Sequence, residues 1–92
     1  MNLLFKPKFR RDVEKVNNRA LLIALQEKLQ QIRNASTPSQ ITGLKLLRSY
    51  RSHYRILVKT EKHSYRIGAV IRNDTIWLVR FLSRKTIYLE FP

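Results

Sequence analysis

The chain has 92 residues, of which 43% are hydrophobic and 27% are charged. This length supports one folded domain, residues 1–92, and the apolar content is too high for a disordered chain. The absence of cysteine excludes disulfides and thiolate chemistry, and no apolar run approaches the roughly 20 residues of a membrane span. The N-terminus lacks the order of a signal peptide, so we expect a cytoplasmic protein with no membrane partner.

Net positive charge is the strongest signal in the composition. Nineteen Lys and Arg residues stand against six Asp and Glu residues, which gives a formal charge of +13. Such an excess repels itself in the folded state and is most often used to bind a polyanion or an acidic protein. Nucleic acid is therefore the first candidate partner, and a generally basic surface is the alternative.

The first half of the chain predicts one short strand and two helices. The apolar run at residues 3–5, stopped by Pro7, predicts the strand, and residues 10–16 predict a brief helix. Asn17 or Asn18 is expected to cap a second helix that ends near Ala35. Its apolar stripe has spacings of three, four and three residues and consists of Leu22, Leu25, Leu29 and Ile32.

After Gly43 the apolar period changes to two. Residues 54–58, 65–71 and 75–82 predict three strands rich in β-branched and aromatic residues, and Asn73 and Asp74 mark a tight turn between the last two. This pattern is typical of an antiparallel meander. The order of elements predicts an α+β fold: a small, mostly antiparallel twisted sheet with two N-terminal helices packed on one face.

The length of the loop between the last two strands decides which side chains share a face. A two-residue loop would place Arg80 among apolar side chains, so we expect a three-residue loop, with Arg66 opposite Arg80 on the face away from the helices. The helix-facing side would then carry Tyr65, Ile67, Ala69, Ile71, Trp77, Val79 and Phe81.

Basic residues follow the solvent side of these strands and the segment after them. They are Arg55, Lys59, Arg66, Arg80, Arg84 and Lys85. Guanidinium groups donate paired hydrogen bonds to phosphate oxygens, so a shared face of this kind would bind an RNA backbone. Ordinary solvent-facing strand residues remain the alternative.

The usual catalytic sets are missing from the sequence. His53 and His63 lack metal-ligand spacing, the six carboxylates form no obvious pair, and no Gly-rich phosphate loop exists, so we expect neither metal nor cofactor. RNA cleavage needs neither, because the ribose 2′-hydroxyl can attack its own phosphate when a group accepts its proton and cations stabilise the phosphate. Tyr88 near several guanidinium groups would have its phenolate favoured; a packing role for its ring is the alternative.

The C-terminal half resembles the RelE/ParE superfamily of toxins from bacterial type II toxin–antitoxin systems. The resemblance rests on "YRILV", "YRIGAVIRNDTIWLVRFLSRKTIY" and the preceding "GLKLLRSYRSHYRI". For RelE-like members it implies a small twisted sheet with two N-terminal helices and metal-independent, ribosome-dependent cleavage of mRNA. By matched position, Arg55 is a basic strand residue, Arg66 the arginine that stabilises the transition state, Arg84 a basic neighbour and Tyr88 the C-terminal tyrosine.

The resemblance has departures and leaves alternatives open. Leu57 stands where a lysine is usual, Leu82 where the arginine assigned as general acid is found, and Ser83 where many relatives have histidine. An inhibitor of DNA gyrase like ParE, or a non-catalytic nucleic-acid-binding protein of the same fold, would not need those residues. The expected partners are mRNA on the ribosome and an acidic, partly disordered antitoxin that folds on binding.

Overall fold

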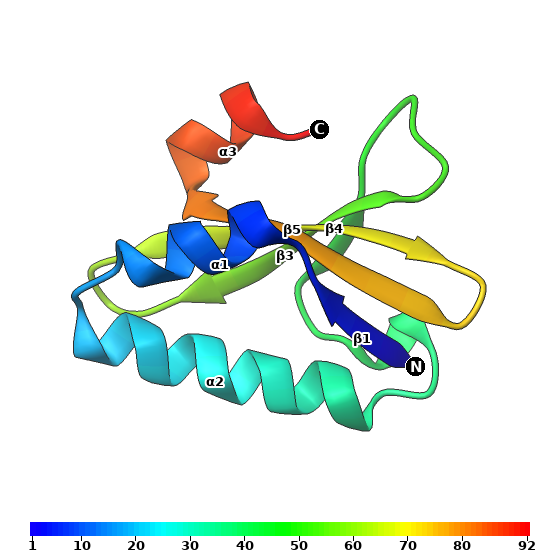
Figure 1. Ribbon diagram of the computed structural model, residues 1–92, viewed down its shortest axis with the longest axis horizontal. Coiled ribbons are helices and arrows are strands. Elements are labelled where there is room, and N and C mark those ends of the chain that lie inside the picture. Colours follow the sequence, from blue (N-terminus) through cyan, green and yellow to red (C-terminus); the bar gives the residue numbers. More distant parts are fainter.

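A five-stranded sheet organises the chain, and the computed structural model describes all of residues 1–92 (Figure 1). The strand order is β1-β5-β4-β3-β2; β1 runs parallel to β5, and the other neighbours are antiparallel. The elements in chain order are β1 (Asn2–Phe5), α1 (Pro7–Glu14), α2 (Arg19–Asn34), the short 3-10 helix η1 (Pro38–Gln40), β2 (Leu44–Leu46), β3 (His53–Lys59), β4 (Ser64–Arg72), β5 (Thr75–Ser83) and α3 (Arg84–Glu90).

The helices cover both faces of the sheet. The buried side chains of α1 and α2, such as Phe9 and Leu25, form one core with Ile56, Ile67 and Phe81 of the sheet. A second, smaller cluster on the opposite face joins α3 to the chain before β3 and consists of Leu47, Ile87 and Phe91. The α+β prediction with two N-terminal helices on one face is confirmed, while α3 was not expected.

The N-terminal elements follow the sequence with shifted boundaries. β1 ends before Pro7, as predicted, and Pro7 also begins α1, because its missing N–H costs nothing at the first helical position. Asn18 is the N-cap of α2, and its side chain accepts a hydrogen bond of 2.9 Å from the backbone N–H of Leu21. Leu21 is fully buried and Leu22 only partly, so the stripe begins one residue earlier than predicted.

The connection between β4 and β5 corrects the predicted loop. It has two residues, since Arg72 pairs with Thr75, and Asn73 takes a left-handed conformation with φ of 54°. Ala69 pairs with Leu78 and Gly68 with Arg80, so Val79 is the extra residue of a β-bulge. The bulge changes which side chains face the core: Ile76, Leu78 and Phe81 are buried there, whereas Trp77 and Val79 are not.

Arg80 therefore stays out of the core although the loop has two residues and not the predicted three. It lies opposite Gly68, not Arg66, and its guanidinium donates to both oxygens of Asp12, at 2.8 and 3.2 Å. β1 pairs with β5 only as far as Leu78, and the Asp12 carboxylate also accepts the backbone N–H of Phe81 at 3.0 Å. Asp12 thus accepts a backbone hydrogen bond from the edge of β5 beyond the point where β1 ends.

Candidate active site

The face of the sheet beneath α3 carries the arginines of β3 and β4. Arg55 pairs with Gly68, and Leu57 pairs with Arg66. Because directly opposed residues point to the same side, these four residues and Lys59 share one face. The register thus confirms that Arg55, Lys59 and Arg66 lie on one face. Arg80, opposite Gly68, belongs to the same face, but its guanidinium is bonded to Asp12 and is not available there.

Helix α3 places Tyr88 over this face. Ser83 is the N-cap of the helix, its side chain accepts from the backbone N–H of Thr86 at 3.4 Å, and buried Ile87 anchors the helix to the sheet. Tyr88 is 46% exposed, so its ring is accessible to a ligand. Arg84 lies one helical turn earlier, with its guanidinium carbon 5.5 Å from the centre of the Tyr88 ring.

Positive charge around Tyr88 favours its phenolate. The pKa of the Tyr88 phenol is lowered from its ordinary value, chiefly by a hydrogen bond with the Arg84 guanidinium. Desolvation opposes this effect, and the charges of Arg84, Arg66 and Arg55 lower the pKa further. The site therefore brings three predicted arginines, Arg55, Arg66 and Arg84, near the phenol of the fourth predicted residue, Tyr88.

Arg55 connects the sheet, α3 and the C-terminal tail. Its guanidinium carbon lies 4.4 Å from the centre of the Tyr88 ring, and its terminal nitrogen donates to the backbone oxygen of Phe91 at 3.3 Å. The Nε atom of Arg55 is buried without an acceptor. The Phe91 ring lies directly on Gly68, where an added Cβ would stand 2.6 Å from the ring. Sequence reasoning missed Phe91; its spacing of four from Ile87 was the available signal.

Apolar side chains flank Arg66 on both neighbouring strands. Leu57 of β3 and Leu82 of β5 are its cross-strand partners, and both are positions where the RelE-like pattern has a basic residue. The guanidinium of Arg66 is held by Ser64 Oγ at 2.8 Å and by the backbone oxygen of Tyr65 at 3.2 Å. Arg66 is thus oriented by its own strand, and its two cross-strand partners are apolar.

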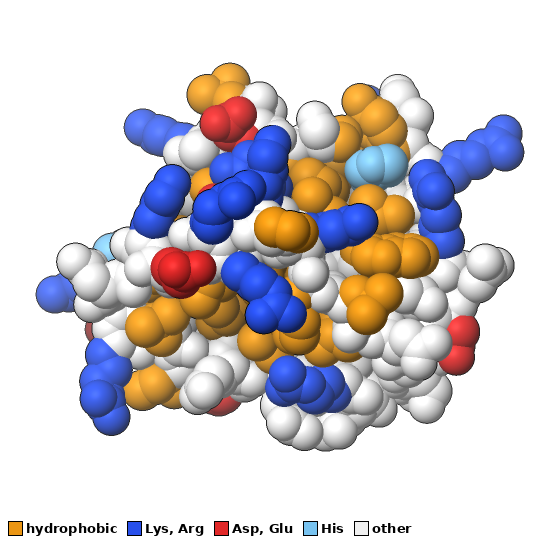
Figure 2. Space-filling view, viewed as in Figure 1, with side chains coloured by type: hydrophobic (Ala, Val, Ile, Leu, Met, Phe, Trp, Pro, Cys, Tyr) orange, Lys and Arg blue, Asp and Glu red, His pale blue; other side chains and the backbone are white.

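The remaining predicted cations lie around the margin of the site. Lys59, Arg84 and Lys85 are exposed, whereas the side chain of Arg80 is only 17% exposed and is occupied by Asp12. Figure 2 shows Lys and Arg side chains gathered between α3 and α1 in this view, and others around the connection between β2 and β3. The accessible positive charge near α3 is therefore carried by Arg84 and Lys85 and not by Arg80.

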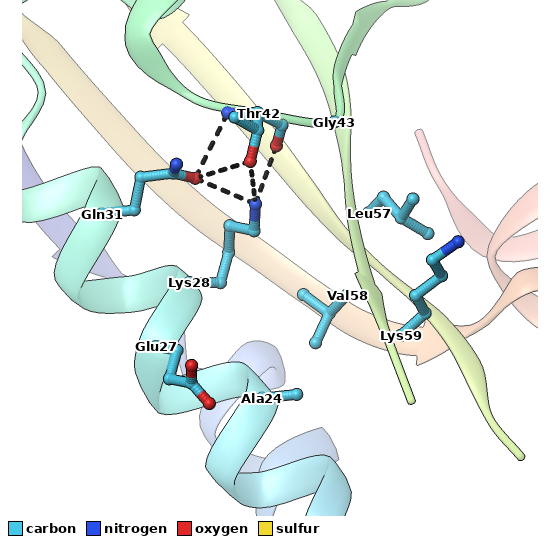
Figure 3. Close-up of a pocket in the computed structure, with 9 residues that line it drawn as sticks. All are labelled: Ala24, Glu27, Lys28, Gln31, Thr42, Gly43, Leu57, Val58 and Lys59. Carbon is cyan, nitrogen blue, oxygen red and sulfur yellow. Dashed lines mark hydrogen bonds between the residues drawn. The ribbon is translucent and has the colours of Figure 1, made fainter. Parts of the chain in front are cut away.

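A hollow with a volume of about 570 Å³ lies between α2 and β3, and its lining includes Leu57 and Lys59 (Figure 3). In it, the Lys28 ammonium donates to Gln31 Oε1 at 2.9 Å and to both Thr42 oxygens at 2.8 Å. Burial lowers the pKa of Lys28. All three ammonium hydrogens thus have acceptors, so Lys28 joins α2 to the chain before β2 and offers no donor to a ligand.

Comparison with known proteins agrees with this architecture. No protein-family model matches the sequence. A relative named Toxin RelE3, from Methanocaldococcus jannaschii, is 32% identical over 97 aligned positions that cover 100% of both chains. The crystal structure of a RelB–RelE antitoxin–toxin complex from Methanococcus jannaschii matches 97% of this chain and 99% of its own, with a TM-score of 0.75 and 28% identity. None of the helices has the length and apolar content that a membrane span requires.

Because the similarity to Toxin RelE3 and to the RelB–RelE complex extends over the full length, the chain belongs to the RelE family of toxins from toxin–antitoxin systems.

Proposed function

We propose that the chain inhibits translation by cutting mRNA on the ribosome, as a metal-independent endoribonuclease. The observation that carries this proposal is the position of Tyr88, an exposed phenol whose pKa is lowered by Arg84, Arg66 and Arg55. A phenol poised in this way can accept a proton near neutral pH more readily than an ordinary tyrosine. Membership of a toxin family is consistent with a reaction that stops growth.

The reaction follows from these groups. The Tyr88 phenolate accepts the proton of a ribose 2′-hydroxyl, and the 2′-oxygen attacks the adjacent phosphorus. The bond from phosphorus to the 5′-oxygen breaks as the new bond forms, leaving a 2′,3′-cyclic phosphate and a 5′-oxygen that takes up a proton from water. Arg66 and Arg84 stabilise the charge that develops on the phosphate oxygens.

Lys59 and Lys85 supply the outer contacts to the RNA backbone in this proposal. Both are exposed at the margin of the site and can neutralise phosphates away from the reacting bond. Arg80 is left out, because Asp12 takes its guanidinium hydrogen bonds and thereby raises its pKa.

The direct test uses purified protein and ribosomes that carry a defined mRNA. We expect cleavage of the bound mRNA at the Mg²⁺ concentration that the ribosome itself requires. Cleavage of the same RNA free in solution should be slower and should persist when a chelator removes divalent metal. Primer extension locates the cut, and the 5′ product should end in a cyclic phosphate. Intact ribosome-bound mRNA after long incubation would contradict the proposal.

A second candidate function is inhibition of DNA gyrase without any cleavage. The observation that favours it is the pair of leucines, Leu57 and Leu82, on both sides of Arg66. With these leucines, the site has fewer cations than the active site that the RelE-like pattern implies. Supercoiling assays with purified gyrase distinguish the two candidates, because a ribosome-dependent nuclease leaves gyrase activity unchanged.

An acidic antitoxin is the protein partner in this proposal. The matched solved structure is an antitoxin–toxin complex, and the +13 charge here favours an acidic, partly disordered segment that folds on binding. It would neutralise the toxin by covering Arg66 and Tyr88, or by displacing α3. Co-expression with the neighbouring small reading frame tests this: an acidic product should copurify and restore growth, with an association rate that falls as salt rises.

A further inference from the structure

The connection between β2 and β3 projects beside α3 as a basic arm, residues 47–52 (Figure 1). Backbone hydrogen bonds fix its shape: Leu47 N–H donates to His53 at 2.9 Å, and Tyr50 N–H donates to Leu47 at 3.3 Å. Ser49 turns the chain at its tip in a left-handed conformation with φ of 69°. The base of the arm is held by Leu47, which is buried against α3. The arm is therefore an ordered part of the surface.

A row of aromatic rings runs from this arm to the candidate active site. The centres of the Tyr50 and His53 rings are 5.1 Å apart, and those of His53 and Phe91 are 5.8 Å apart. Phe91 is in turn bonded through its backbone oxygen to Arg55, which stacks on Tyr88. An exposed ring on the arm is thus joined to the catalytic phenol by a continuous set of contacts.

The outermost ring, Tyr50, is not required by either apolar core. It belongs to neither buried cluster and keeps 46% of its surface exposed, while His53 supports it from one side. Arg48 and Arg51 flank it, and both are exposed. A supported aromatic ring between two arginines is the arrangement that single-stranded nucleic acids bind, with bases stacked on the ring and phosphates paired with the cations.

Packing alone is the simpler explanation of the row, but it accounts only for its inner part. Phe91 is 5% exposed and needs a neighbour such as His53 to stay dry. Tyr50 adds little to the burial of Phe91. Two neighbouring arginines repel each other, so this segment is not explained by a gain in stability of the fold. An acidic protein would pair with the arginines without needing the ring, whereas single-stranded RNA uses a stacked ring and nearby cations together.

We infer that Tyr50, supported by His53, stacks on a base of the substrate RNA away from the bond that is cut. Arg48 and Arg51 pair with the phosphates on either side of that base. The inference rests on the proposed nuclease function, because it extends the same RNA-binding surface from Tyr88 across Phe91 to the arm. It makes the arm a positioning element that holds one flanking nucleotide and so sets which phosphate reaches the site.

Binding of a short single-stranded RNA with 2′-O-methyl riboses tests this, because such an RNA cannot be cut. Fluorescence anisotropy at low salt should show that Tyr50→Ala weakens binding on the order of 10-fold, while Tyr50→Phe, which keeps the ring, stays within about twofold of the parent. Ile23→Ala is the matched control, because Ile23 is also 46% exposed but lies on α2. Thermal denaturation checks that all variants are folded.

Abasic nucleotides placed at successive positions separate stacking from a general structural effect. In the parent, loss of one particular base should weaken binding as much as Tyr50→Ala does, and the two losses should not add. Equal affinity of Tyr50→Ala and parent, additive losses at every position, or a parent that does not bind the RNA would each overturn the inference. Failure of the nuclease proposal is distinct: it would appear as intact mRNA on ribosomes while the position-specific loss persists.

Discussion

Arg55 and Tyr88 are in contact although 32 residues separate them in the chain, with the guanidinium carbon of Arg55 4.4 Å from the centre of the Tyr88 ring. The contact spans β3 and α3 and fixes the height of the phenol above the sheet. It also places a permanent positive charge on the ring, which lowers the pKa of Tyr88 together with Arg84 and Arg66. The Arg55 contact thus positions the phenol, whereas Arg84 is the main cause of its lowered pKa.

Tyr88→Phe removes only the hydroxyl and keeps the contact of the ring with Arg55. If the phenol accepts the 2′-hydroxyl proton, cleavage should fall on the order of 10²-fold or more, while binding of RNA is retained. Single-turnover cleavage of ribosome-bound mRNA measures this. A rate equal to that of the parent would assign Tyr88 to packing and not to catalysis.

The pH dependence of cleavage should follow the ionisation of Tyr88. Its pKa lies below the ordinary tyrosine value, so the phenolate forms as the pH rises through that lowered pKa, and the rate should rise with it and then level off. Arg84→Ala removes the main cause of the lowered Tyr88 pKa and should move the rise in cleavage rate to higher pH. Lys85→Ala removes the neighbouring cation and should not change the pH at which the cleavage rate rises.

The ultraviolet absorbance of tyrosinate provides an independent measure of the same ionisation. The Tyr88→Phe spectrum, subtracted from that of the parent, isolates one phenol among four tyrosines. The midpoint of this difference should lie below the ordinary tyrosine range and rise in Arg84→Ala. An unchanged midpoint in Arg84→Ala would contradict the assigned cause.

Gly68→Ala should disturb the site through Phe91. The added Cβ would stand 2.6 Å from the Phe91 ring, so the ring and the tail behind α3 must move. We expect reduced cleavage with the helix-facing core intact, because that core lies on the other face of the sheet. Phe91→Ala removes the obstacle, so Gly68→Ala should cost much less in that background. Additive losses in the double variant would refute the close approach as the cause.

Asp12→Ala should lower stability more than any other single change of an acidic residue. It leaves the Arg80 guanidinium and the Phe81 N–H without their acceptor, at a cost of about 3 kcal/mol in the free energy of unfolding. Urea denaturation measures this. Glu14→Ala on the same helix is the control: Glu14 is exposed and forms no salt bridge, so its loss should cost less than about 0.5 kcal/mol.

Much of the fold was predictable because local chemistry decided it. The cap at Asn18, the helix it begins and the alternating strands after Gly43 all follow from short-range preferences. α1 begins three residues before the predicted helix, because Pro7 is favourable as a first helical residue as well as unfavourable in a strand. Helix α3 was missed although Ser83 and the spacing of Ile87 from Phe91 indicated it.

Which side chains of β5 face the core could not be predicted from the sequence, because this depends on tertiary contacts. A bulge at Val79 allows a two-residue turn and a buried Phe81 at once, and Asp12, 68 residues away from Arg80, makes the resulting position of the arginine tolerable. No local pattern connects those two residues. The group of Arg55, Arg66, Arg84 and Tyr88 was predictable by position, whereas its contact with Phe91 required the fold.

Cleavage of ribosome-bound mRNA by the parent and by Arg66→Ala tests the central claim most directly. Arg66 is oriented by Ser64 and carries no core packing, so its loss should leave the fold intact and reduce cleavage on the order of 10²-fold or more, with loss of growth arrest at matched expression. Lys8→Ala, an exposed cation on α1, is the control and should cut like the parent. A 2′-deoxyribose at the cut position should block the parent completely. Equal cleavage by Arg66→Ala and the parent, or cleavage at the 2′-deoxy position, would contradict this account of the site.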